Sequence, residues 1–200
     1  MTASSTSKST IRKQLRERIN AMSEADRHAK SLAACALVAA TPEFAAARCI
    51  MLYLSTPTEV DTAPLALRAW QASKTIVVPK VSCDQRRMLP VEITSLKDGV
   101  TTTGPVREPI AGTPMPVEFI DLVIVPGVGF TATGQRIGRG MGFYDRFLAQ
   151  QEFIGVSCGL AFEEQIVPEL PTLDHDMALS MLASDRGVRR FASHCIGQQK

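Results

Sequence analysis

Six of the thirteen glycines of the chain lie within residues 127–142. They are Gly127, Gly129, Gly134, Gly138, Gly140 and Gly142. Arg136 and Arg139 lie in the same stretch, which follows the apolar run LVIV and precedes a helical pattern that begins near Phe143. A strand, a glycine-rich loop and a helix N-terminus in this order bring backbone N–H groups together around an anion. The pattern favours phosphate binding, and a purely structural glycine loop is the alternative.

This loop does not match the common nucleotide-binding fingerprints. No GxxxxGK[ST] motif occurs, and GRGMGF departs from GxGxxG because Phe143 takes the place of the last glycine. Spacing alone therefore leaves the identity of the anion open.

The elements that must position the loop alternate between strand and helix. Short runs rich in branched and aromatic residues predict strands, and these runs are IMLYL, TIVVPKV, LPVEI, FIDLVIVPG, FIGVSCGLAF and ALSMLAS. Residues 62–73 and 143–151 have helical patterns between some of them, and the unbroken run LVIV is typical of a strand buried on both faces. We therefore expect an α/β fold of three layers, with helices flanking a largely parallel central sheet.

The N-terminal part of the chain predicts a helical hairpin. Residues 9–22 place apolar side chains at helical spacing among basic ones, and residues 23–26 resemble a capping box that opens a second helix ending near residue 40. Residues 99–116 show no period and predict a long surface loop. We expect residues 1–200 to form a single domain, with residues 1–7 as a disordered tail.

Composition and charge exclude several classes of protein. The net charge of +2 is too small for a protein whose main partner is nucleic acid. The longest apolar run has nine residues, whereas a membrane-spanning helix needs about 20. The first ten residues lack the apolar segment of a secretory signal, so we expect a cytoplasmic protein. We also expect a monomer or a weak dimer. Five widely spaced cysteines with no CxxC motif indicate neither a disulfide framework nor a zinc site.

The glycine-rich stretch also carries a family resemblance. PGVGFTATGQRIGRGMGFYDRFL, at residues 126–148, resembles the signature of the 5-formyltetrahydrofolate cyclo-ligase family. Further segments match the family in order, namely Lys8 with Arg12, YLSTPTEVDT, VVPK, REP and LAFEEQIVPELPTLDHDM. The resemblance spans about residues 8–185. It implies ATP- and magnesium-dependent conversion of 5-formyltetrahydrofolate, with or without a polyglutamate tail, to 5,10-methenyltetrahydrofolate.

The resemblance also implies residue roles. The ATP-binding residues would be Lys8, Arg12, Arg136, Gly138, Arg139, Gly140, Met141, Gly142, Phe143 and Tyr144. Arg139 and Tyr144 would also be catalytic. The folate-binding residues would be Leu54, Glu59, Phe143 and Tyr144, and the Mg²⁺ ligands Asp145 and Asp176.

Local patterns offer an alternative for each of these groups. Lys8 and Arg12 also suit a solvated helix face, Glu59 a helix cap, and Asp145 the acidic first turn of a helix. Asp176 also suits a turn, and the neighbouring His175 favours a structural or solvated role over that of a base.

Met141 departs from the family, which has Gly or Lys at this position. A Met side chain conflicts with a backbone that needs positive φ, and it crowds a nucleotide. Met141 therefore keeps open a rival hypothesis, a non-catalytic paralogue that binds folate or nucleotide. A separate and less favoured rival is a nucleic-acid-binding protein that uses the basic first helix.

Overall fold

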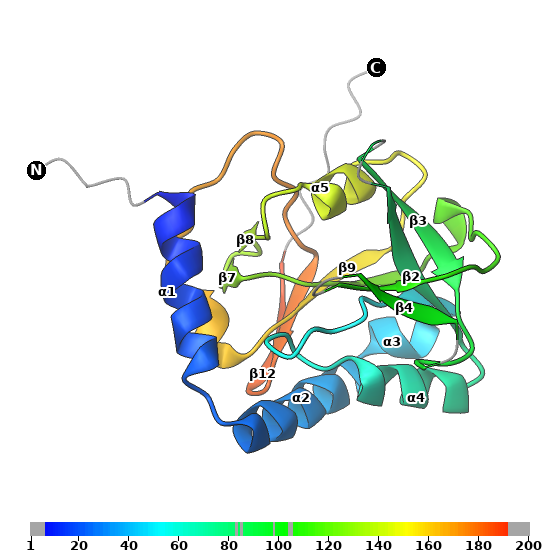
Figure 1. Cartoon of the computed structure of the whole chain (residues 1–200), viewed down its shortest axis with the longest axis horizontal. Helices are drawn as coiled ribbons and strands as arrows, with labels where there is room; N and C mark the ends of the chain where they lie inside the picture. The colour runs from blue at the N-terminus through cyan, green and yellow to red at the C-terminus, as the bar shows by residue number, and fades with distance from the viewer. Residues whose placement is uncertain (1–6, 83, 85, 98, 104–105, 192–200) are drawn as a thin grey trace, which may run out of the picture.

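The core of the protein is a seven-stranded sheet with the strand order β12-β11-β9-β6-β1-β2-β3 (Figure 1). This computed structural model describes residues 7–82, 84, 86–97, 99–103 and 106–191. The strands of the sheet are β1 (Cys49–Met51), β2 (Thr75–Ser82), β3 (Arg87–Glu92), β6 (Leu122–Val125), β9 (Val156–Leu160), β11 (Met181–Ser184) and β12 (Gly187–Arg190). The five inner strands are parallel and the two edge strands are antiparallel to their neighbours. The predicted α/β fold with a largely parallel sheet is confirmed.

Helices cover both faces of this sheet (Figure 1). One face carries α2 (Glu24–Ala39), α3 (Pro42–Ala46) and α4 (Ala63–Gln71), and the other carries α5 (Phe143–Leu148). Strand β6 alternates between the faces, because Leu122 and Ile124 pack with the first group and Val123 and Val125 with α5. All four residues are buried, as the LVIV run predicts. Within the described ranges, no helix is both long enough and apolar enough to span a bilayer.

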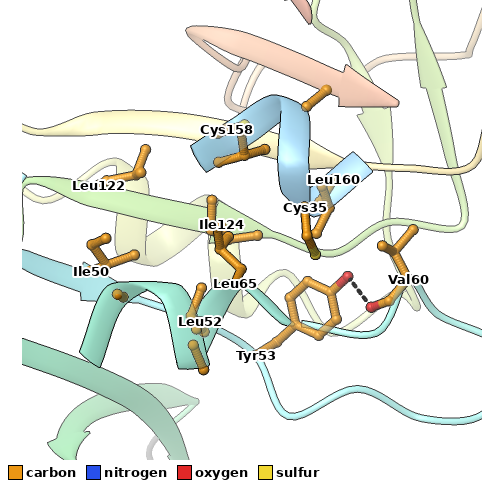
Figure 2. Packing of buried hydrophobic residues seen from close by; sticks show 14 of the residues in the cluster. Cys35, Ile50, Leu52, Tyr53, Val60, Leu65, Leu122, Ile124, Cys158 and Leu160 are labelled. Atoms are coloured by element: carbon orange, nitrogen blue, oxygen red, sulfur yellow. Dashed lines mark hydrogen bonds between the residues drawn. The ribbon is translucent and has the colours of Figure 1, made fainter. Parts of the chain in front are cut away.

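The larger core cluster surrounds Tyr53, whose hydroxyl donates a hydrogen bond to the carbonyl oxygen of Val60 at 2.9 Å (Figure 2). Cys35 and Cys158 lie in the same cluster, and Cys49 lies on the opposite face of the sheet. Burial raises the thiol pKa to about 12 for Cys35 and Cys158 and to about 11 for Cys49. These three thiols therefore stay protonated and act as small core side chains.

Helix α1 (Lys8–Asn20) holds a second, smaller sheet against the body of the protein. This sheet has the order β10-β7-β8, with β7 (Gly129–Thr131), β8 (Arg136–Ile137) and β10 (Ile166–Val167). Leu15 of α1 packs with Ile137 of this sheet, whereas Ile19, one turn later, packs in the main core. The apolar stripe of α1 is thus divided between two structures.

The predicted helical hairpin is wrong in geometry, although its two helices exist. Figure 1 shows α1 standing at a steep angle to α2, because α1 covers the small sheet while α2 packs on α4 and the main sheet. Ser23 caps α2 by accepting a hydrogen bond from Asp26 N–H, as predicted. Ser7 caps α1 in the same way and so is not part of a disordered tail, and residues 1–6 lie outside the described residues.

Several short strands were not expected from the sequence. The long loop predicted at residues 99–116 contains the hairpin β4 (Val100–Thr103) and β5 (Val106–Pro109), and η1 (Val117–Phe119) follows it. Strands of two to four residues are too short to show an alternating pattern. The expected strand IMLYL pairs only over β1, and the helix expected at residues 143–151 ends at Leu148. The sequence did not predict these two ends, because neither is marked by a Gly or a Pro.

The strand order creates a crevice beside β1. The chain passes from β1 to β2 on one side of it and later returns to β6 on its other side. The loops that leave the carboxyl ends of β1 and β6 therefore diverge, and open α/β sheets bind ligands at such a point. Residues 52–62 and 126–142 follow these two strands.

The close packing of the sheet predicts an unequal response to alanine at two glycines. A Cβ on Gly155 would lie 2.4 Å from the carbonyl oxygen of Ile120 and 2.7 Å from that of Asp121, whereas a Cβ on Gly187 would meet nothing within 4 Å. Gly155→Ala should lower the free energy of unfolding by about 2 kcal/mol, because the backbone must shift. Gly187→Ala should change it by less than about 0.5 kcal/mol. Urea unfolding of the two variants measures the difference, and equal midpoints would contradict the packing described here.

Candidate functional site

A cavity of about 500 Å³ lies at this crevice, and every residue that the resemblance assigns to ATP, folate or Mg²⁺ lines it. These residues are Lys8, Arg12, Leu54, Glu59, Arg136, Gly138, Arg139, Gly140, Met141, Gly142, Phe143, Tyr144, Asp145 and Asp176. They come from the N-terminus of α1, the loop after β1, the stretch from β8 to α5, and the segment before β11. The tertiary structure thus brings together residues that are up to 168 positions apart in the chain.

The glycine loop makes a sharp turn before α5. Gly140 and Gly142 have φ values of 111° and 63°, which favour glycine, whereas Met141 between them has no positive φ. The conflict with positive φ considered for Met141 therefore does not arise. Its side chain is 55% exposed at the edge of the cavity, where it is free to contact a ligand.

The two basic residues of α1 face the cavity from successive turns. Arg12 Nε donates a hydrogen bond to the Gly138 carbonyl at 2.8 Å, and Lys8 Nζ lies 2.8 Å from Asp176 Oδ2. Asp176 Oδ2 also accepts a bond from Leu173 N–H. Burial opposes the charged form of Asp176, but these contacts outweigh it and hold the pKa of this carboxyl below its ordinary value. Both basic residues are thus tied to the site and are not simply part of a solvated helix face.

Arg136 is the buried cation of the site. Its side chain is 4% exposed, and its two terminal nitrogens donate to the Met177 carbonyl at 2.6 Å and to Asp145 Oδ1 at 2.7 Å. The same Asp145 oxygen accepts the Met177 N–H at 3.1 Å. This closed network joins the start of α5 to the segment before β11, so Arg136 supports the walls of the cavity.

Arg139, in contrast, is 44% exposed and reaches the loop after β1. Its Nη2 donates to Glu59 Oε1 at 2.9 Å and to Thr56 Oγ1 at 3.0 Å. Glu59 does not cap α4, because Asp61 Oδ1 accepts the Ala63 N–H at the start of that helix. The helix-cap alternative for Glu59 is therefore excluded.

Tyr144 brings an unpartnered polar atom into the site. Its hydroxyl oxygen is buried and has no hydrogen-bond partner among the described residues. Burial, assisted by the charge of Glu59, raises the pKa of this phenol above its ordinary value, so the group remains a donor at neutral pH. A buried hydroxyl without a partner is costly unless a ligand supplies one. Phe143 and Leu54 add apolar surface beside it.

The carboxylates of Asp145 and Asp176 suit Mg²⁺ in their chemistry. Each has one oxygen bonded to a cation and a backbone N–H, which leaves its second oxygen for another ligand. The described residues contain no group of three or more His, Cys, Asp or Glu side chains that could enclose a metal. The pair therefore fits an ion that takes one or two carboxylates and completes its shell with phosphate oxygens and water.

Sequence reasoning assigned no binding or catalytic role to several residues that line or support the cavity. Thr56, Arg107 and His175 line it, and Arg146 holds the glycine loop by donating to the Met141 carbonyl at 2.8 Å. Arg107 lies in the REP segment, so the family match carried a signal for it. Thr56 also lies in a matched segment, YLSTPTEVDT, but it is one of several polar residues there and no local pattern distinguishes it.

The different burial of the two arginines predicts different effects on stability. Arg136→Met should lower the free energy of unfolding by roughly 3 kcal/mol, because it leaves the Asp145 carboxylate without its cation in a half-buried place. Arg139→Ala should cost about 1 kcal/mol or less, since an exposed ion pair contributes little. Chemical unfolding of both variants tests this order, and a greater loss for Arg139→Ala would reverse the assignment of the supporting residue.

Comparison with known proteins identifies relatives along nearly the whole chain. Residues 4–184 match the model of the 5-formyltetrahydrofolate cyclo-ligase family. The 5-formyltetrahydrofolate cyclo-ligase of Mus musculus is 30% identical over 178 residues, which cover 84% of this chain and 88% of the mouse protein. The enzyme of the same name from Escherichia coli K12 is 29% identical over 151 residues, covering 74% and 83%.

Solved structures agree with this relationship. The NMR structure of Aquifex aeolicus 5,10-methenyltetrahydrofolate synthetase superposes with a TM-score of 0.80 at 27% identity, covering 96% of this chain and 97% of that one. The Mycoplasma pneumoniae synthetase, at 22% identity, shares the fold with a TM-score of 0.74 over 90% of this chain and 99% of its own. The chain therefore belongs to the 5-formyltetrahydrofolate cyclo-ligase family and is an enzyme of the ligase class.

Proposed function

We propose that this protein, acting as one domain, uses ATP and Mg²⁺ to convert 5-formyltetrahydrofolate to 5,10-methenyltetrahydrofolate. The observation that carries the proposal is the shared cavity. A glycine loop with Lys8, Arg12 and Arg139 lines the same cavity of about 500 Å³ as Glu59 and Tyr144. This volume is within the usual range of small-molecule sites. Cations for a triphosphate and acceptors for a pterin therefore meet in one space.

The reaction requires that the formyl oxygen become a leaving group. A formamide is a poor electrophile, so its oxygen first attacks the γ-phosphorus of ATP, and the bond from that phosphorus to the bridging oxygen of ADP breaks. The resulting iminium phosphate has an electrophilic carbon. N10 of the folate then forms a bond to this carbon, the carbon–oxygen bond breaks to release phosphate, and N10 loses its proton. Positioning and charge stabilisation supply most of the catalysis in such transfers.

The residues of the cavity suit these steps. Lys8, Arg12 and Arg139 would neutralise the triphosphate charge while the N–H groups of the glycine loop bind its oxygens. The protonated Tyr144 hydroxyl would donate to the oxygen that is phosphorylated, which would satisfy its missing hydrogen bond. Glu59 would accept pterin N–H groups, and Leu54 and Phe143 would flank the flat ring.

Asp145 and Asp176 are the residues that would hold Mg²⁺. The ion, when bound, would neutralise charge on the phosphate oxygens. Arg136 and Lys8 fix the two carboxylates at the edge of the cavity through the ion pairs described above.

Turnover assays test the proposal. Absorbance of the methenyl product should grow when the protein is mixed with 5-formyltetrahydrofolate, ATP and Mg²⁺, and EDTA should stop it. ATP hydrolysis should require the folate. Binding of both substrates without turnover would support the non-catalytic alternative, and folate-independent ATPase activity of comparable rate would indicate a different phosphoryl acceptor.

Arg139 should be important for the rate. Its guanidinium can bind two phosphate oxygens at once, so Arg139→Ala should lower kcat/KM about 100-fold, the loss expected for one transition-state contact. Arg190→Ala is the matched control, because Arg190 is also an exposed arginine paired with a glutamate, Glu43, but lies outside the cavity. A loss of less than threefold for Arg139→Ala would remove Arg139 from the phosphate site.

A further inference from the structure

Arg139, Glu59 and Thr56 form the wall between two cavities. A second cavity of about 400 Å³ adjoins the first, and the residues common to both are Thr56, Glu59, Gly127 and Arg139. The second cavity is bounded on its far side by α1. The side chains of the three polar residues therefore join the glycine loop to the loop after β1 across the whole site.

These three residues, which we call the Thr56 latch, satisfy one another. Arg139 donates to Glu59 Oε1 and to Thr56 Oγ1, and Glu59 Oε2 accepts both the N–H and the hydroxyl of Thr56, at 2.9 and 3.0 Å. Both oxygens of the carboxylate are thus occupied. In this arrangement the proposed phosphate ligand and the proposed pterin ligand bind each other, and neither is fully available to a substrate.

The two ends of the ion pair differ in burial. The Arg139 side chain is 44% exposed and can leave at small cost, because an exposed ion pair contributes little. The Glu59 side chain is only 15% exposed, so its carboxylate needs a replacement donor once Arg139 has left. Arg136, by contrast, is 4% exposed and also bonded to the backbone of Met177, so it is not free to move in this way.

We propose that the Thr56 latch couples the two substrates, so that binding of the nucleotide increases the affinity for the folate. This inference rests on the proposed function. A triphosphate that draws Arg139 away breaks the latch, and the folate then reaches a carboxylate that has already lost its partner. The free-energy cost of breaking the Arg139–Glu59 contact is met only once when both ligands bind. By linkage, the folate must therefore increase the affinity for the nucleotide by the same factor. Thr56 is the positioning residue that holds both ends.

Calorimetry on the full chain tests this coupling. The Kd of 5-formyltetrahydrofolate is measured with and without Mg²⁺ and saturating β,γ-methylene ATP. This analogue cannot transfer its γ-phosphoryl group. We expect the folate to bind about fivefold or more tightly with the analogue, and the reverse titration to show the same factor.

Thr56→Val removes the hydroxyl and keeps the branched shape. Each substrate alone should then bind at least as tightly as before, and the coupling factor should fall to about half or less, because the Arg139–Glu59 pair loses the two Thr56 hydroxyl bonds that hold its ends. Thr58→Val is the control, because Thr58 is in the same loop and has no bond to Arg139 or Glu59. It should keep the coupling of the parent. Thermal unfolding confirms that both variants are folded, and a purely structural role for Thr56 would change the melting temperature without changing the coupling factor.

The outcomes separate this inference from the proposed function. Coupling absent in the parent, or unchanged in Thr56→Val, overturns the latch, while turnover in the absorbance assay still supports the cyclo-ligase activity. Failure of the parent to bind either substrate overturns both. Coupling that is reciprocal in the parent, reduced in Thr56→Val and unchanged in Thr58→Val supports the latch.

Discussion

The site depends on the reversal of strand order at β1. Because β1 is parallel to β2 on one side and to β6 on the other, all three strands end at the same edge, and the connections after β1 and β6 leave in different directions. The resulting gap cannot be filled by either connection alone. The glycine loop, the Glu59 loop and the start of α1 close around it, and α1 is held there by packing on both the small β10-β7-β8 sheet and the main core.

Charge balance is the second constraint on this cavity. Three of its cations are paired with carboxylates, namely Lys8 with Asp176, Arg136 with Asp145 and Arg139 with Glu59. Uncompensated charges in a half-buried space would destabilise the fold. The pairs differ in burial, and the two arginines therefore differ in role. The buried Arg136 supports the wall of the cavity, whereas the exposed Arg139 can exchange its partner for a ligand.

The glycine loop shows how a departure from the family pattern can be accommodated. The unusual backbone angles fall on Gly140 and Gly142, so Met141 between them takes an ordinary conformation. Its carbonyl is held by Arg146, and its side chain extends to the edge of the cavity. Met141 is therefore compatible with the conformation of the loop, and it lines the cavity as an exposed residue.

The sequence by itself determined the features that come from local patterns. The density of glycines, the unbroken LVIV run and the helical spacing of residues 9–22 indicated a sharp loop, a buried strand of a parallel sheet and a first helix, because glycine conformation, strand burial and helical periodicity are properties of neighbouring residues. The family resemblance added the candidate site residues, all of which line one cavity.

Only the tertiary structure decided which of these residues contact one another. Arg136 and Arg139 are three residues apart and alike in sequence, yet one pairs with Asp145 and the other with Glu59, which is 80 residues away. The angle between α1 and α2, the β4–β5 hairpin and the role of Thr56 also depend on packing between distant segments. Such contacts leave no periodic signal in the chain, because they are set by where the strands of the sheet come to lie.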